Sequence, residues 1–126
     1  MPKILLVEDN EIDRDVLGRR LQRGGFNLCL AVDAPSGISL ACAERPDLIL
    51  MDLSLGEMDG WEAMRRIKSN PTTADIPIIV LTSHPLARDR ARSAEVGCED
   101  FDTKPVDLPR LLRKINTCLA GRQGMR

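Results

Sequence analysis

The residues Leu48-Ile49-Leu50-Met51-Asp52 form an apolar run that ends in a single carboxylate. Pro46-Asp47 precede the run, and Gly56 and Gly60 follow it. Four apolar residues between turn signals are typical of a strand that is buried on both faces, as in a parallel sheet. Open α/β sheets bind ligands in the crevice outside the carboxyl ends of their strands. The pattern therefore predicts that Asp52 lies at the edge where such a sheet does its chemistry.

Two other apolar runs also end in polar residues. Ile4-Leu5-Leu6-Val7 leads into Glu8-Asp9, and Ile78-Ile79-Val80-Leu81 leads into Thr82. If the three strands are parallel and adjacent, their polar ends meet at one edge of the sheet. Glu8-Asp9 also has a plainer interpretation, as the N-cap of the helix that follows.

The remaining pattern alternates between strands and helices. Strands are expected at 3–7, 26–32, 48–52, 78–81 and 99–102, and helices at 11–23, 33–43, 58–67, 85–96 and 107–119, with Asp107 as the N-cap of the last. In the first helix, Ile12, Val16, Leu17 and Leu21 recur at helical spacing and are expected to share a buried face. The alternation predicts a parallel sheet with right-handed crossovers and helices on both faces.

Length and composition bound the remaining possibilities. A chain of 126 residues predicts one domain, with a core over about 3–119 and a polar tail at 121–126. The net charge of -1 indicates neither a nucleic-acid nor a membrane partner. Four separated cysteines, with no C-x-x-C pair, indicate buried or half-buried thiols in a reducing compartment. Because no apolar run is long enough for a signal peptide or a membrane span, a cytoplasmic location is expected.

Glu8, Asp9 and Asp52 would bring three carboxylates to one edge of the sheet. Like charges at that distance force at least one carboxyl group to keep its proton unless a cation is present. An all-oxygen donor set suits Mg²⁺ better than zinc. Lys104 would add an ammonium group and Thr82 a hydroxyl donor. Together these groups predict a site that receives a phosphoryl group on Asp52 and forms an aspartyl phosphate.

Five short motifs follow the strand ends in order. They are Val7-Glu8-Asp9-Asn10, Leu50-Met51-Asp52-Leu53-Ser54-Leu55, Met58-Asp59-Gly60, Leu81-Thr82-Ser83 and Asp102-Thr103-Lys104-Pro105. From Lys3 to about Leu119 the chain resembles the receiver domains of two-component response regulators, the CheY-like superfamily. The resemblance implies a flavodoxin-like, doubly wound, five-stranded parallel sheet in the order 2-1-3-4-5, flanked by five helices.

The resemblance also implies a phosphodonor and a cofactor. Asp52 would accept a phosphoryl group from a histidine kinase or a histidine phosphotransfer protein. The cofactor would be Mg²⁺, held directly by Asp9, mostly through water by Glu8, and by Asp52 and the backbone carbonyl of Ser54. Beyond self-phosphorylation and self-dephosphorylation, no enzymatic activity is implied.

A switch is implied as well. Thr82 and Lys104 would contact the phosphoryl oxygens, and Thr82, in moving toward them, would free the pocket that Phe101 fills. The Lys104-Pro105 bond is usually cis in this family. Two departures from the family pattern, Gly56 in place of proline and Phe101 in place of the frequent tyrosine, bear on signalling output and not on phosphorylation.

The fourth helix, the fifth strand and the last helix are the surface on which the family recruits downstream protein targets. Arg88, Arg90 and Arg92 in the fourth helix fit this surface or a plain solvated face equally well. The single histidine, His84, is interpreted as a loop residue that could tune the lifetime of the phosphate, and Trp61 as a packing residue. A monomer or weak dimer is expected.

Four other functions are alternatives, and the residues argue against the last two. The chain could be a phosphorelay intermediate or phosphate sink without an effector of its own, or a receiver cut from a hybrid histidine kinase. A phosphatase of the haloacid dehalogenase type also uses an aspartyl nucleophile, but Asp52-Leu53-Ser54 lacks the second acid of its D-x-D motif. The complete set of site residues argues against a phosphate-independent scaffold.

Overall fold

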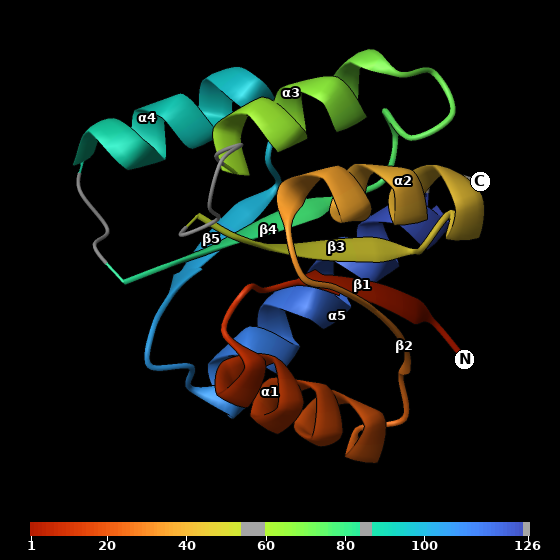
Figure 1. Ribbon diagram of the computed structural model, residues 1–126, viewed down its shortest axis with the longest axis vertical. Coiled ribbons are helices and arrows are strands. Elements are labelled where there is room, and N and C mark those ends of the chain that lie inside the picture. Colours follow the sequence, from red (N-terminus) through yellow and green to blue (C-terminus); the bar gives the residue numbers. More distant parts are fainter. Residues whose placement is uncertain (54–59, 84–86, 125–126) are drawn as a thin grey trace.

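The computed structural model describes residues 1–53, 60–83 and 87–124, which form five strands and five helices in alternation (Figure 1). The strands are β1 (Lys3–Val7), β2 (Asn27–Ala31), β3 (Leu48–Asp52), β4 (Ile78–Thr82) and β5 (Asp100–Thr103). The helices are α1 (Glu11–Arg23), α2 (Ala34–Glu44), α3 (Gly60–Ser69), α4 (Ala87–Val96) and α5 (Leu108–Gly124).

All strand pairs are parallel, and the strand order is β2-β1-β3-β4-β5. The expected doubly wound sheet is thereby confirmed. From β1 the chain crosses to β2 on one side, whereas β3 leads to β4 on the other side. The carboxyl ends of β1 and β3 therefore flank the point at which the winding changes direction, which is where sheets of this kind bind ligands.

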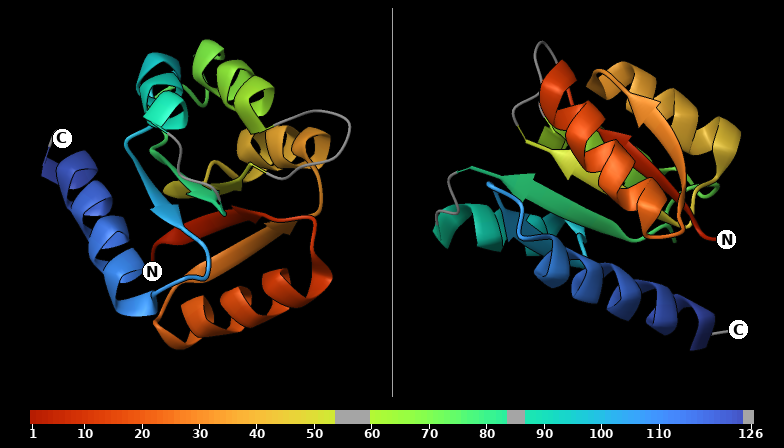
Figure 2. Two further views of the ribbon diagram at one scale, coloured as in Figure 1. Left: turned by 90° about the vertical axis from the view of Figure 1, so that its left-hand side faces the viewer. Right: turned by 90° about the horizontal axis from the view of Figure 1, so that it is seen from below.

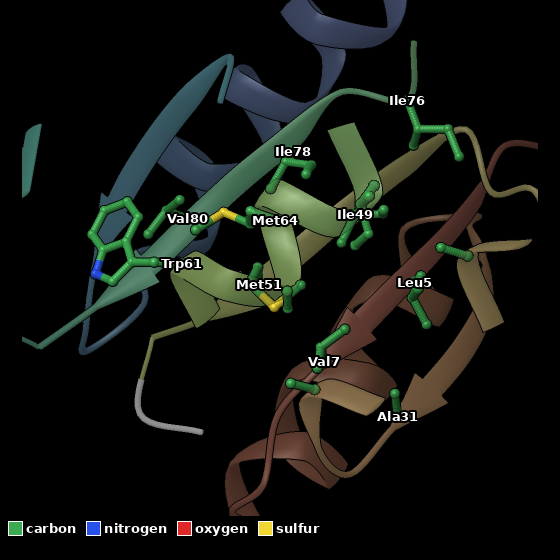
Figure 3. Packing of buried hydrophobic residues seen from close by; sticks show 14 residues of the cluster. Leu5, Val7, Ala31, Ile49, Met51, Trp61, Met64, Ile76, Ile78 and Val80 are labelled. Carbon is green, nitrogen blue, oxygen red and sulfur yellow. The ribbon is translucent and has the colours of Figure 1, made fainter. Parts of the chain in front are cut away.

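The helices form a layer on each face of the sheet, with α1 and α5 on one face and α2, α3 and α4 on the other (Figure 2). Each layer encloses its own apolar core. The core under α2 and α3, drawn in Figure 3, contains Leu5, Val7, Ile49, Met51, Trp61 and Met64 among others. The opposite core contains Ile4, Leu6, Leu50, Leu17, Leu111 and Ile115 among others. The strands are apolar on both sides because both faces are covered.

Side-chain caps set the start of α1, α2 and α5, and those of α1 and α5 test the sequence predictions. Asn10, and not Glu8 or Asp9, is the N-cap of α1, because its side chain accepts a hydrogen bond from the N–H of Asp13 at 2.9 Å. The plainer interpretation of the Glu8-Asp9 pair is therefore wrong. Asp107 caps α5 as predicted, since its Oδ1 accepts from the N–H of Arg110 at 3.1 Å.

The predicted apolar stripe of α1 is half wrong. Leu17 and Leu21 are buried, but Ile12 is 73% exposed and Val16 is 45% exposed. The reason is that α1 lies at the outer side of the sheet, against the edge strand β2, so only one line of its side chains reaches the core.

Two other differences from the predictions are smaller. Cys42 is exposed instead of buried or half-buried, while Cys29, Cys98 and Cys118 are half-buried as expected. Helix α5 continues to Gly124, so it includes the first residues of the predicted polar tail. None of the helices in the described part of the chain is long and apolar enough to cross a membrane.

Gly37 allows α2 to approach β1 closely. A Cβ atom at this position would lie 2.9 Å and 3.1 Å from the two γ-carbons of Val7, which is fully buried. We expect Gly37→Ala to lower the free energy of unfolding by about 1 kcal/mol, because over-packing costs more than the gain in helix propensity. Gly121→Ala in α5 is the matched control, because nothing lies within 4 Å of its added Cβ. Urea denaturation measures both, and an equal gain in stability for the two variants would contradict the prediction.

Candidate functional site

The carboxylates of Glu8, Asp9 and Asp52 lie together at the carboxyl ends of β1 and β3. One carboxylate oxygen from each residue lies within 4.8 Å of the other two. The strand register explains this, because Val7 pairs with Met51 and the next residue of each strand segment is an acid. Glu8 and Asp52 are 2% and 1% exposed, whereas Asp9 is exposed. The sequence prediction that these three side chains meet is confirmed.

Lys104 brings an ammonium group to the same place from the connection between β5 and α5. Its Nζ lies 2.6 Å from Glu8 Oε1 and 3.0 Å from Asp52 Oδ2. Its backbone N–H donates to the carbonyl oxygen of Thr82 at 2.8 Å, and the bond to Pro105 is cis, as the family resemblance implied. Lys104 therefore joins the ends of β1 and β3 to the end of β4.

The surroundings shift the titration of the buried groups. Burial, together with a hydrogen bond and charge repulsion from Asp52, raises the pKa of Glu8 from 4.5 to about 7, although Lys104 opposes the shift. Burial alone would lower the pKa of Lys104, but its hydrogen bonds to Glu8 and Asp52 outweigh burial and raise it. The site thus contains more carboxylate than one ammonium group neutralises.

We expect the stability of the protein in EDTA to fall as the pH rises from about 4.5 to about 7. In this window the folded protein keeps the proton of Glu8, with a pKa of about 7, that the unfolded chain has already lost. Folding is therefore favoured at the acid end, and the advantage disappears above the folded pKa. Chemical denaturation across this range measures the slope, with Glu8→Gln as the comparison. A difference between wild type and variant that does not change with pH would contradict the prediction.

The donor set fits a magnesium ion. Its members are carboxylate oxygens, without a histidine or cysteine ligand among the described residues of the cluster. Mg²⁺ prefers such oxygen ligands and keeps several waters, which the exposed Asp9 allows. Burial is the main cause of the raised pKa of Glu8, and a divalent cation would offset the additional repulsion from Asp52. Glu8, Asp9 and Asp52 are the residues that could hold it.

Thr82 and Phe101 lie on the side of the site that is formed by β4 and β5. Thr82 is a buried residue at the end of β4 and pairs with Thr103. Phe101 pairs with Val80 and packs, half-buried, against the core under α2 and α3. The two residues are thus in neighbouring strands near the site, and their motion as a switch stays a prediction. Ser54, Gly56 and His84 lie outside the described residues.

A cleft of about 500 Å³ opens next to Lys104, between α1 and the connection from β5 to α5. Its lining residues are Glu8, Asp13, Val16, Leu17, Arg20, Ser83, Lys104, Pro105 and Val106. Because Glu8 and Lys104 form part of its wall, a molecule in this cleft reaches the ion-paired groups directly.

Three contributions near the site escaped the sequence analysis. The guanidinium of Arg14 donates to the carbonyl oxygen of Glu8 at 2.9 Å and holds the chain where it leaves β1. Gly60, used above as a turn signal and as part of a family motif, also allows α3 to begin against β3, because a Cβ there would lie 3.0 Å from the carbonyl oxygen of Asp52. Asp102 is buried beside Arg110 of α5, a pairing that no signal in the sequence reveals.

Trp61 is a packing residue, as predicted. It is buried in the core under α2 and α3 (Figure 3). The guanidinium carbon of Arg92 lies 5.0 Å from the centre of the Trp61 ring. Arg92 therefore makes a cation–π contact that joins α4 to α3. The side chains of Arg88 and Arg90 lie outside the described residues.

Comparison with known proteins gives matches along most of the chain. The response regulator receiver domain matches residues 4–116. Protein PilH of Pseudomonas aeruginosa is 34% identical over 121 residues, which are 96% of this chain and 100% of PilH. The polar-differentiation response regulator DivK of Brucella anthropi is 32% identical over 94% of this chain and 98% of its own length. The DNA-binding transcriptional regulator RpaA of Synechocystis is 34% identical, but this chain spans only 49% of it.

Solved structures agree with these matches. A CheY-like response regulator receiver domain protein from Methanospirillum hungatei superposes with a TM-score of 0.91 at 25% identity, over 100% of this chain and 99% of that one. The receiver domain of a sensor histidine kinase from Pseudomonas aeruginosa, with a magnesium ion in its active-site cleft, gives 0.87 at 33% identity, over 94% and 98%. Fold and sequence lead to one conclusion: the chain belongs to the response regulator receiver domain family of two-component systems.

Proposed function

We propose that the chain is a phosphorylation-controlled switch in which Asp52 accepts a phosphoryl group from a histidine kinase or a histidine phosphotransfer protein. One observation carries the proposal. Asp52 is buried at a strand end, ion-paired to Lys104 at 3.0 Å, and grouped with two further carboxylates that suit Mg²⁺. If Asp52 only stabilised the fold, it would not need the carboxylates of Glu8 and Asp9 beside it.

Each residue has a defined task in the transfer. A carboxylate oxygen of Asp52 attacks phosphorus, and the bond from phosphorus to the donor's histidine nitrogen breaks as the new P–O bond forms. The ammonium group of Lys104 neutralises charge on the transferred oxygens, and the hydroxyl of Thr82 donates a hydrogen bond to one of them. Bound Mg²⁺, held by Asp9, Asp52, the carbonyl of Ser54 and, through water, Glu8, would supply further positive charge.

The phosphorylated form would then change a protein-binding surface. Lys104 now bridges Glu8 and Asp52, and a phosphoryl group on Asp52 would compete for its ammonium group. Thr82 would move toward the phosphoryl group and Phe101 into the space it leaves, so that the surface of α4, β5 and α5 changes. We place this switch in the cytoplasm, where histidine kinases draw on ATP, and assign it no catalysis beyond its own phosphorylation and dephosphorylation.

A phosphorelay intermediate is the second candidate function. The similarity to the receiver domain of a sensor histidine kinase favours it. In this case the phosphoryl group passes from Asp52 to a histidine phosphotransfer protein. Transfer from the phosphorylated chain back to such a protein distinguishes the relay from a switch that retains its phosphate.

The proposal is tested with acetyl phosphate as the donor. Wild-type protein is incubated with Mg²⁺ and acetyl phosphate, and the phosphoryl adduct is followed by intact mass, while Trp61 fluorescence reports changes next to the site. We expect an adduct that forms only with Mg²⁺ and not when EDTA is added before the donor, and that is hydrolysed on standing at alkaline pH, as an acyl phosphate is. Absence of the adduct at saturating Mg²⁺ and donor would refute the function.

A further inference from the structure

Arg110 connects the first turn of α5 to the end of β5. Its Nε and Nη2 lie 2.8 Å and 2.7 Å from Oδ1 of Asp102, and Nη2 also donates to Oγ1 of Thr103 at 3.2 Å. The backbone N–H of Thr103 donates to the same Asp102 oxygen at 2.8 Å. We call these contacts the Arg110 bridge. They hold the last two residues of β5 from the side of the helix.

The position of Asp102 makes the bridge unusual. Asp102 is 2% exposed and pairs with Leu81, on the face of the sheet where Leu81 packs in the apolar core with Leu111 of α5. Its Oδ2 has no hydrogen-bond partner among the described residues. An ion pair between a buried carboxylate and an arginine side chain that is 36% exposed contributes little net stability compared with apolar side chains of similar size, because desolvation of the carboxylate offsets the attraction. Stability alone therefore does not account for a carboxylate here.

The bridge encloses the segment that carries Lys104. Lys104 directly follows Thr103, and α5 begins four residues later at Leu108. At the far end of this connection the backbone N–H of Arg110 donates to Asp107, while at the near end the side chain of Arg110 holds Asp102 and Thr103. One residue thus contacts both ends of the connection and limits the movement of the backbone between them.

The restraint on this connection matters because the ammonium group of Lys104 must reach two carboxylates on other strands. The Nζ of Lys104 contacts Glu8 at 2.6 Å and Asp52 at 3.0 Å, across the end of β4. A lysine side chain has four flexible carbons, so the place of its ammonium group depends on where its backbone is held. A misplacement of about 1 Å at a reacting centre can cost up to about a hundredfold in rate.

We propose that Arg110 is a positioning residue for phosphoryl transfer: through Asp102 and Thr103 it holds the backbone from which Lys104 reaches Asp52. The inference rests on the proposed function and deepens it. Arg110 contacts neither Asp52 nor the metal-binding carboxylates among the described residues, so its effect is confined to the ammonium group of Lys104.

Three variants test the bridge. Arg110→Gln removes the two guanidinium contacts and leaves the buried carboxylate of Asp102 with the more distant Lys114, 3.8 Å away, as its cation, which by itself destabilises the fold. The double variant Asp102→Leu/Arg110→Leu replaces the ion pair with apolar side chains and is expected to fold. Arg113→Gln is the matched control, because Arg113 is an exposed arginine in the same helix whose side chain has no acidic partner in the described part of the chain.

The rate of phosphorylation and the affinity for Mg²⁺ are measured separately. At saturating acetyl phosphate, we expect the double Leu variant and Arg110→Gln to be phosphorylated about tenfold more slowly than wild type and Arg113→Gln. Mg²⁺ affinity, from Trp61 fluorescence, is expected to stay unchanged because Glu8, Asp9 and Asp52 keep their places. A wild-type rate in the double Leu variant, or equal losses of rate and of Mg²⁺ affinity, would overturn the inference.

A second measurement needs no phosphoryl transfer. The ¹⁵N NMR signal of the Lys104 side-chain ammonium is expected to be sharp in wild type and Arg113→Gln, where two carboxylates hold it, and to shift and broaden in the double Leu variant. If wild type accepts no phosphoryl group, the proposed function fails, while this comparison still decides the role of Arg110. An identical Lys104 signal in all the variants would refute that role.

Discussion

Asp52→Asn is expected to abolish phosphorylation by acetyl phosphate while the protein stays folded. The side-chain amide of asparagine has nearly the same shape as the carboxylate, but its oxygen is a much weaker nucleophile. Stability is expected not to fall, because the change removes one of two buried carboxylates that share a single ammonium group, Lys104. Intact mass measures the adduct, and thermal denaturation in EDTA measures the stability.

The matched control for this variant is Asp15→Asn. Asp15 is an exposed acid of α1 in a surface ion pair with Arg19, so its loss removes a carboxylate without touching the site. The control is expected to be phosphorylated at the wild-type rate. An adduct of undiminished yield on Asp52→Asn would show that another group, such as Asp9, is the acceptor, and would overturn the assignment.

Lys104→Met is expected to slow phosphorylation by roughly a hundredfold to a thousandfold, the usual cost of removing one group that stabilises charge in the transition state. Methionine preserves most of the side-chain volume and removes only the ammonium group. Mg²⁺ binding is expected to persist, because the three carboxylates remain and the competing cation has gone. Phosphorylation kinetics and a Mg²⁺ titration followed by Trp61 fluorescence separate the two effects.

Lys104→Arg serves as the comparison. It keeps the charge but presents it in a planar fork that does not reproduce the contacts of the ammonium group with Glu8 and Asp52, so we expect an intermediate rate. An unchanged rate in Lys104→Met would exclude a role of this residue in transfer. A loss of Mg²⁺ affinity that matches the loss of rate would instead assign Lys104 to the metal site.

The central part of the site was predictable because it depends on strand ends. Apolar runs that stop at Glu8, Asp52 and Thr82 predict both the strands and where their polar ends lie, provided that the strands are parallel. Side chains alternate between the two faces of a strand, so a shift of one residue between β1 and β3 would move every side chain to the opposite face. Only one register therefore keeps both cores apolar, and it fixes the positions of Glu8 and Asp52.

Features that depend on the packing of one particular helix were not predictable in this way. Ile12 and Val16 have the spacing of a buried stripe, yet α1 lies against the edge strand and leaves them exposed. The partnership of Asp102 with Arg110 also escapes periodicity, because a charged residue in a strand indicates exposure until a helix is placed over it. Its detection needs the angle at which α5 returns across the sheet.

Residues of the site are far apart in the chain, since Glu8 and Lys104 are separated by 96 positions and Asp52 and Lys104 by 52. Only the paired parallel strands bring them together, so an unfolded chain has no comparable affinity for the ion. By mass action, any ligand of the folded form alone shifts the folding equilibrium toward that form. The midpoint of thermal denaturation should thus rise with the concentration of free Mg²⁺. The stability of the sheet would then report the fraction of folded protein that has the cation bound.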